Sequence, residues 1–214
     1  MYNLNSFKTL MAAFALAVML VLGSSTNVQA QCPTDIAPTG APAWIHATAP
    51  LHFNISCPNG TCAIDVDYCY RYISNYPTSG TTTYQTVVVG DINYSGNCDC
   101  SDQSRFDQIA VHLQKTATGL GGCTGNYTPL IAATYKSACW KKVPIYDINH
   151  VLISRQYTPC SNARCKISCE ICESNGVVTF QNCSTAILGT VDCEKLLVWG
   201  DGQCSLVDCS SNPN

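Results

Sequence analysis

The clearest hydrophobic pattern in the chain is an alternation with a period of two residues between Phe53 and Tyr72. Such a period indicates a β-strand that buries one face and exposes the other. The expected inner face holds Ile64, Val66, Tyr68 and Tyr70, and the expected outer face holds Asp65, Asp67, Cys69 and Arg71. Runs of apolar and β-branched residues at 84–89, 130–137 and 151–155 predict further strands. The pattern therefore predicts a fold dominated by sheet.

One stretch, residues 102–117, follows the helical period instead. Its apolar face consists of Phe106, Ile109, Ala110 and Leu113. Ser101 or Asp102 is a suitable N-cap, and Gly119 follows as a stop signal. The expected fold class is α+β with β dominant: an antiparallel sheet, one amphipathic helix and a disulfide-rich C-terminal hairpin region.

The sequence Asn175-Gly176 predicts the turn of a β-hairpin, because both residues tolerate the positive φ of a type I′ turn. The partners across that hairpin would be Glu173 with Val178, Ile171 with Phe180, and Cys169 with Asn182.

Residues 1–30 have the pattern of a secretory signal peptide. Lys8 precedes an apolar run over residues 10–22, and Val28-Gln29-Ala30 is a suitable cleavage site. The run is too short to span a bilayer, and no later run reaches that length. We therefore expect a protein secreted to the extracellular space or cell surface, without a membrane span.

All 16 cysteines follow this segment, and an even number in an exported chain predicts a framework of up to eight disulfides. The cysteines are Cys32, Cys57, Cys62, Cys69, Cys98, Cys100, Cys123, Cys139, Cys160, Cys165, Cys169, Cys172, Cys183, Cys193, Cys204 and Cys209. The alternative for Cys169 and Cys172 is a zinc site, but the second ligand pair that it needs is absent from the sequence.

The expected domains are an α+β domain at 31–159 and a cysteine-rich β tail at 160–214, or one continuous domain at 31–214. Each of the two segments holds eight cysteines, which permits two self-contained sets of disulfides. Four prolines make residues 31–50 an extended lead without helix. This lead either packs on its own domain or is lent to the sheet edge of a neighbouring copy.

The polar residues 91–102 are expected to form a loop that aligns with the calcium-loop pattern of EF-hands. The ligands would be Asp91, Asn93, Ser95, Asn97, Asp99 and Asp102, with Gly96 at the turn. A strand rather than a helix precedes the loop, and Asp102 stands where glutamate is usual. The alternative is a polar turn in which Asp102 caps the helix.

Other catalytic signals are weak. The chain has no GxSxG, HExxH or Walker sequence, and His46, His52, His112 and His150 have no recognisable nucleophile beside them. Asp65 and Asp67, about 7 Å apart on a strand face, could form an acid–base pair, but they also suit an exposed sheet face. We therefore predict no catalytic residues and no cofactor other than calcium.

Only 12% of the residues are charged and the net charge is −3, with no basic stripe to attract nucleic acid or an anionic membrane. The pattern favours a secreted, non-enzymatic structural or surface-binding protein that binds itself or extracellular surface components. An inhibitor or ligand-binding module, and a hydrolase with an unrecognised site, are the alternatives.

Overall fold

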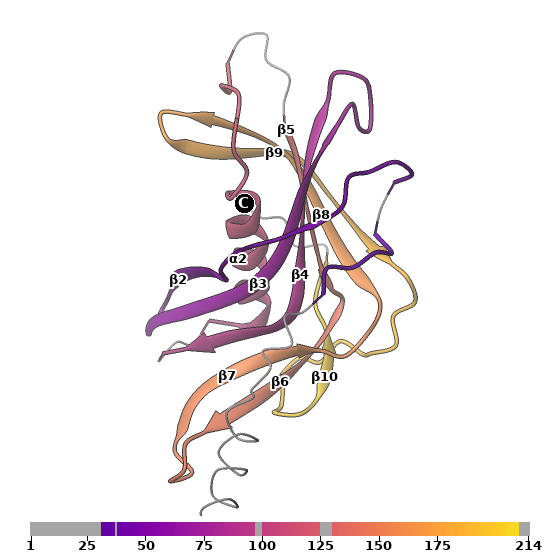
Figure 1. The fold of residues 1–214 in the computed structure, drawn as a ribbon. Coiled ribbons are helices and arrows are strands. Elements are labelled where there is room, and N and C mark those ends of the chain that lie inside the picture. The colour runs from indigo at the N-terminus through magenta and orange to yellow at the C-terminus, as the bar shows by residue number, and fades with distance from the viewer. Residues whose placement is uncertain (1–30, 37, 97–99, 125–129, 210–214) are drawn as a thin grey trace, which may run out of the picture. The chain divides into compact units, whose positions relative to one another are not determined.

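A branched, mainly antiparallel sheet forms most of the structure (Figure 1). The structure is a computed structural model, and it describes residues 31–36, 38–96, 100–124 and 130–209. The ten strands are β1 Ile45–His46, β2 Leu51–Cys57, β3 Gly60–Ser74, β4 Thr82–Ser95, β5 Leu130–Ser137, β6 Cys139–Tyr146, β7 Leu152–Pro159, β8 Arg164–Ser174, β9 Val177–Leu188 and β10 Cys204–Leu206. In the described part of the chain one helix, α2 Asp102–Gln114, accompanies them. The expected β-dominant α+β class is confirmed.

The sheet branches at β4. One edge of β4 pairs with β3, and the other edge is shared between two strands. β5 pairs with residues 82–87 of β4, and β7 pairs with Ile92–Tyr94. β8 and β9 continue the branch from β5, and β6 and β10 continue the branch from β7. β4 and β5 are parallel, an exception to the expected antiparallel sheet, because α2 forms the crossover between them.

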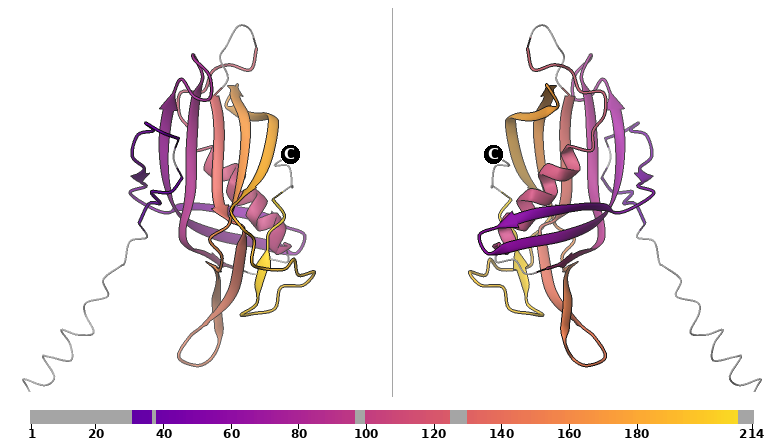
Figure 2. Two further views of the ribbon diagram at one scale, coloured as in Figure 1. Left: turned by 90° about the vertical axis from the view of Figure 1, so that its right-hand side faces the viewer. Right: turned by 90° about the vertical axis from the view of Figure 1, so that its left-hand side faces the viewer.

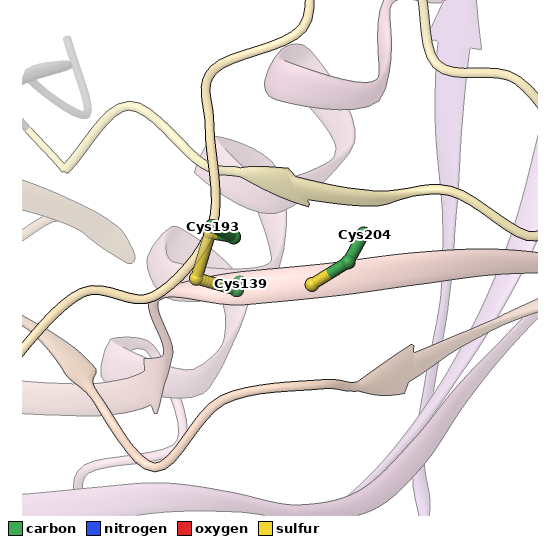
Figure 3. A group of neighbouring side chains, drawn as sticks. All are labelled: Cys139, Cys193 and Cys204. Atoms are coloured by element: carbon green, nitrogen blue, oxygen red, sulfur yellow. A yellow bond between two sulfur atoms is a disulfide. The ribbon is translucent and has the colours of Figure 1, made fainter.

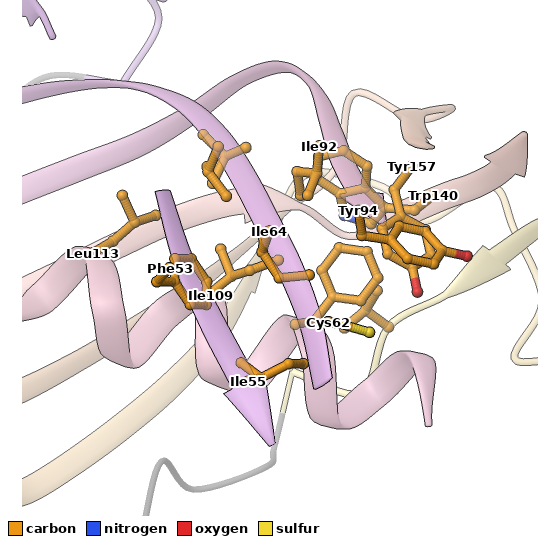
Figure 4. Packing of buried hydrophobic residues seen from close by; sticks show 14 residues of the cluster. Phe53, Ile55, Cys62, Ile64, Ile92, Tyr94, Ile109, Leu113, Trp140 and Tyr157 are labelled. Atoms are coloured by element: carbon orange, nitrogen blue, oxygen red, sulfur yellow. The ribbon is translucent and has the colours of Figure 1, made fainter. Parts of the chain in front are cut away.

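The predicted helix is confirmed, but α2 ends at Gln114, before the expected end at residue 117. The Ser101 side chain accepts a hydrogen bond from the Ser104 amide and caps the N-terminus. Phe106, Ile109 and Leu113 are fully buried in a cluster with residues of β2, β3 and β6 (Figure 4). In the described part of the chain, no helix is both long and apolar enough to cross a bilayer.

The two faces of β3 only partly follow the expected alternation. Ile64 and Val66 are buried as predicted, but the register with β4 shifts after Val66, where Gly90 of β4 has a φ of +66°. Cys69 and Arg71, expected on the exposed face, are buried. That prediction was wrong because a second layer of chain covers this end of the strand.

The covering layer is the proline-rich lead, which packs on its own sheet on the side away from α2 (Figure 2). Cys32 is bonded to Cys69, and Ile45 pairs with Tyr70. In this single chain the lead thus packs on its own domain, the first of its two expected arrangements.

The stretch 91–95, expected to begin a loop, is instead the last part of β4. Ile92 and Tyr94 are buried while Asp91 and Asn93 are exposed, so the strand alternation continues through the polar sequence. The prediction overlooked the two apolar residues that alternate with the supposed ligands.

The hairpin of β8 and β9 turns at Asn175 and Gly176, whose φ values are +54° and +77°. Two expected pairs, Glu173 with Val178 and Ile171 with Phe180, are confirmed. The third is wrong, because β9 contains an extra residue near Asn182 that shifts the later pairs by one.

Seven disulfides join described cysteines: Cys32–Cys69, Cys57–Cys100, Cys123–Cys172, Cys139–Cys193, Cys160–Cys204, Cys165–Cys209 and Cys169–Cys183. Cys62 is also disulfide-bonded, and Cys98 lies outside the described residues. Two of the bridges, at Cys123 and Cys139, connect the chain before residue 160 to the chain after it. The disulfides therefore do not form two self-contained sets, one of the arrangements left open by the sequence, because β8 and β10 lie in the same sheet as β5 and β6.

Candidate functional site: a tyrosine-lined groove

An open groove of about 460 Å³ lies beside β3 on the side of the sheet that carries α2. We call it the tyrosine groove. It is lined by Ile45, His46, Ala47, Thr48, Ala49, Tyr68, Tyr70, Tyr72, Tyr84, Thr116 and Thr118. Among these, the four tyrosines provide most of the aromatic surface.

The strand period places the tyrosines together. Tyr68, Tyr70 and Tyr72 are two residues apart on β3 and therefore share a face. Tyr84 of β4 is the cross-strand partner of Tyr72, which puts its ring on the same face. The alternation in the sequence assigned Tyr68 and Tyr70 to the core, but both are only half-buried because α2 ends at Gln114.

The four rings lie side by side, with those of Tyr68, Tyr70 and Tyr72 partly exposed and that of Tyr84 buried beside them. Ring centroids of Tyr68 and Tyr70 are 6.2 Å apart, those of Tyr70 and Tyr84 are 6.3 Å apart, and those of Tyr72 and Tyr84 are 4.7 Å apart. All three pairs are tilted rather than stacked, so the surface is stepped.

Hydroxyl contacts hold two of the rings in place. The Tyr84 hydroxyl lies 2.6 Å from Thr116 Oγ1, and Thr116 in turn donates to the Leu113 carbonyl at 2.7 Å. The Tyr72 hydroxyl accepts from the Thr118 amide at 2.7 Å. Burial, the largest influence, raises the pKa of Tyr84 well above its ordinary value, so this hydroxyl stays neutral.

The other two tyrosines have hydroxyls available to a ligand. Within the described residues, the hydroxyls of Tyr68 and Tyr70 make no hydrogen bond with the protein, unlike those of Tyr72 and Tyr84. The groove thus combines two fixed rings with two rings whose polar ends are open to solvent or ligand.

Among the described residues, no aspartate, glutamate, lysine or arginine belongs to the lining. His46 is nearest to a charge: its Nε2 lies 3.3 Å from Asp67, and its Nδ1 donates to the Ala47 carbonyl at 2.8 Å. His52 pairs with Asp65 at 2.7 Å. The two aspartates considered as an acid–base pair therefore each contact a histidine, and neither lines the groove.

The remaining histidines lie elsewhere. The His112 ring stacks on Phe53 with centroids 4.0 Å apart, and burial lowers the pKa of its imidazole. His150 has a φ of +59° in the turn between β6 and β7. Neither histidine lines the tyrosine groove.

The predicted calcium ligands do not all lie in a loop. Asp91, Asn93 and Ser95 are on the exposed face of β4, and Asn97 and Asp99 lie outside the described residues. Asp91 accepts a hydrogen bond from Gln156 at 3.1 Å. Calcium binding stays a prediction, and the carboxylate of Asp102 already has other partners.

Asp102 belongs to a buried polar network that the sequence reading missed. Its carboxylate accepts from Arg105 at 2.8 Å and from the Tyr157 hydroxyl, and Lys142 lies 3.4 Å away. Burial, followed by the charge of Asp102, strongly raises the pKa of Tyr157. The spacing of Asp102 and Arg105 at i and i+3 of a helix was the available signal.

Three cysteine sulfurs, those of Cys139, Cys193 and Cys204, lie within 4.8 Å of one another (Figure 3). All three are disulfide-bonded, Cys204 to Cys160, and therefore offer no thiolate to a metal. The same holds for Cys169 and Cys172, whose spacing had suggested zinc as an alternative. That alternative was wrong.

Comparisons of the chain with protein-family models, with curated proteins and with solved structures give no match. No relative therefore assigns a ligand to the tyrosine groove. Its chemistry follows from the side chains that line it: aromatic rings, hydroxyls and no carboxylate or basic side chain apart from one histidine.

Proposed function

We propose that this chain is a secreted, non-enzymatic surface-binding protein whose tyrosine groove holds a neutral sugar chain. The observation that carries the proposal is a groove whose described lining includes four tyrosines and no aspartate, glutamate, lysine or arginine. A disulfide-rich β fold is compatible with an extracellular protein, because disulfides persist in oxidising surroundings.

The groove and a sugar chain have complementary surfaces. A pyranose ring has an apolar face of C–H groups and a rim of hydroxyls, and a tyrosine offers an apolar ring face with a polar end. The hydroxyls of Tyr68, Tyr70 and Thr48 can both donate and accept, as sugar hydroxyls do. A charged ligand would lose hydration without finding an opposite charge in the lining.

Proline-rich peptides also bind aromatic grooves. Such a peptide presents mainly carbonyl oxygens, which need donors, whereas the groove offers hydroxyls that act in both directions. Hydrolysis of a bound sugar normally requires two carboxyl groups beside the scissile bond, and the lining contains none. These features favour sugar binding without cleavage.

The test is retention of the secreted protein on neutral polysaccharides such as cellulose, xylan, chitin and mannan, with anionic alginate for comparison. We expect retention on at least one neutral polymer. Tyr70→Ala should weaken it about tenfold, the effect of losing roughly 1.4 kcal/mol of aromatic contact. Tyr146→Ala, an exposed tyrosine outside the groove, is the matched control and should bind as the unmodified protein does.

Failure on every neutral polymer would contradict the proposal. Equal retention of Tyr70→Ala and the unmodified protein would contradict the assignment of the groove. Retention only on immobilised proline-rich peptide would favour the peptide-binding alternative instead.

A further inference from the structure

β9 has a free edge that takes no part in the tyrosine groove. In the described part of the chain β9 pairs with β8 and with no second strand. Its 12 residues include no charged residue and no proline. Natural edge strands are usually protected by such residues, because open backbone N–H and C=O groups attract another strand. Only the bulge near Asn182 interrupts this edge.

Apolar side chains are exposed at both ends of β9. Val177 is 64% exposed at one end, and Ile187 and Leu188 are 46% and 40% exposed at the other. Val178 and Cys183 both pack toward the core, and the extra residue between them reverses the alternation. Val178 and Ile187 therefore share the inner face of the strand, and Val177 and Leu188 share the outer face.

We propose that two copies of the protein pair through β9 in an antiparallel manner, about a two-fold axis between Asn182 and Cys183. In this register Val177 of one copy lies opposite Leu188 of the other, and Val178 lies opposite Ile187. Each pair joins side chains on the same face, and the symmetry forms each pair twice. A shift by one residue would set an inner side chain against an outer one.

The charges of the neighbouring strand favour this antiparallel arrangement. β8 carries Arg164 and Lys166 at one end and Glu170 and Glu173 at the other. Asp35 already lies 3.4 Å from Arg164, so Lys166 carries most of the basic charge. Across the two-fold axis, the basic end of one β8 aligns with the acidic end of the other, about 14 Å away at three strand spacings. At that distance salt screens the attraction between these charges. The attraction therefore favours the antiparallel orientation of the two copies but contributes little to the affinity.

The size of the contact predicts a reversible dimer. Specific interfaces bury at least about 1,200 Å², and pairing along one strand edge lies at or below that limit. A dissociation constant on the order of micromolar is therefore expected. Sedimentation velocity of the secreted protein, from about 1 μM to about 1 mM, should show a monomer–dimer equilibrium.

The register gives a charge-pairing test. Val177→Glu alone and Leu188→Lys alone should each weaken the dimer about tenfold or more, because each sets a charge against an apolar cross-strand partner, and the symmetry repeats this loss twice. The double variant should regain most of the loss, because the two new charges face each other only across the two-fold axis. Ile148→Lys, at a 96% exposed site between β6 and β7, is the matched control and should dimerise normally.

A monomer throughout the concentration range would overturn the proposal. So would single variants that dimerise normally, a double variant without recovery, or dissociation by Ile148→Lys. Circular dichroism of each variant should match that of the unmodified protein, which separates loss of pairing from loss of fold. Sugar binding plays no part in this assay, so the two proposals can fail independently.

Discussion

Lys136 is the residue whose burial has the clearest energetic consequence. It lies fully buried on β5, where its Nζ donates to the Phe106 carbonyl at 3.2 Å and sits 5.2 Å from the Phe106 ring centre. Burial lowers the pKa of this lysine to about 8, against the opposing influence of Asp107 and Asp208. The strand pattern placed residue 136 within a strand but gave no sign that its charge would be enclosed.

We predict that Lys136→Met stabilises the fold at pH 7 by up to roughly 3 kcal/mol, the cost of lowering the lysine pKa from its ordinary value to about 8. Between pH 8 and 10.5 the unfolded chain keeps the lysine proton that the native protein has lost. The free energy of unfolding of the unmodified protein therefore increases as pH rises through this range. The difference in stability between Lys136→Met and the unmodified protein decreases accordingly. Urea unfolding at pH 7 and pH 10 measures the difference, and a difference that stays constant would contradict the assignment.

At the scale of elements, local patterns predicted β3, α2 and the β8–β9 hairpin, because period, caps and turn residues lie within each segment. These local patterns failed where a segment distant in the sequence determines whether a side chain is buried. Arg71 alternates onto the supposed exposed face, yet it is buried under the lead: it donates to Gln85 at 2.9 Å and to the Pro42 carbonyl, and its guanidinium lies 4.0 Å from the Trp44 ring centre. Nothing near residue 71 in the sequence indicates that cover.

Arg71→Lys should loosen the lead. Lysine cannot reproduce the two hydrogen bonds that the planar guanidinium donates to Gln85, or its stacking on the Trp44 ring. We expect a loss of roughly 2–4 kcal/mol and faster hydrogen exchange at residues 44–47, with β8 and β9 unchanged. Arg155→Lys, at a more exposed ion pair 4.0 Å long, is the control and should change little. Unchanged exchange at residues 44–47 in Arg71→Lys would show that the guanidinium does not hold the lead.

The calcium prediction belongs to the segment that begins at the end of β4. Since Asp102 is held by Arg105, Lys142 and Tyr157, a cation would rely on Asp91 and the residues after it. We predict weak binding with a dissociation constant of about 10⁻⁴ to 10⁻³ M, lost in Asp91→Ala. Calorimetry measures it; no heat at millimolar calcium, or equal heat from both proteins, would remove the site.

At the scale of the whole molecule, the cysteine content predicted a disulfide-rich protein but not the pairing. Cysteines become partners because strands distant in sequence pair, as when β8 beside β5 allows Cys172 to reach Cys123. The groove was missed for a related reason. The sequence pattern placed Tyr68 and Tyr70 on one strand face, but it gave no sign that α2 would end at Gln114 and leave them half-buried.

The measurement that tests the central claim most directly is NMR of the protein with isotope-labelled tyrosine rings, titrated with neutral cello-, xylo- and chito-oligosaccharides. At ligand concentrations up to about 10 mM, the groove account predicts that one of them shifts the ring signals of Tyr68, Tyr70 and Tyr72. The signals of Tyr146 and of buried Tyr157, both outside the groove, should stay in place. Absence of any shift, or shifts confined to tyrosines outside the groove, would contradict it.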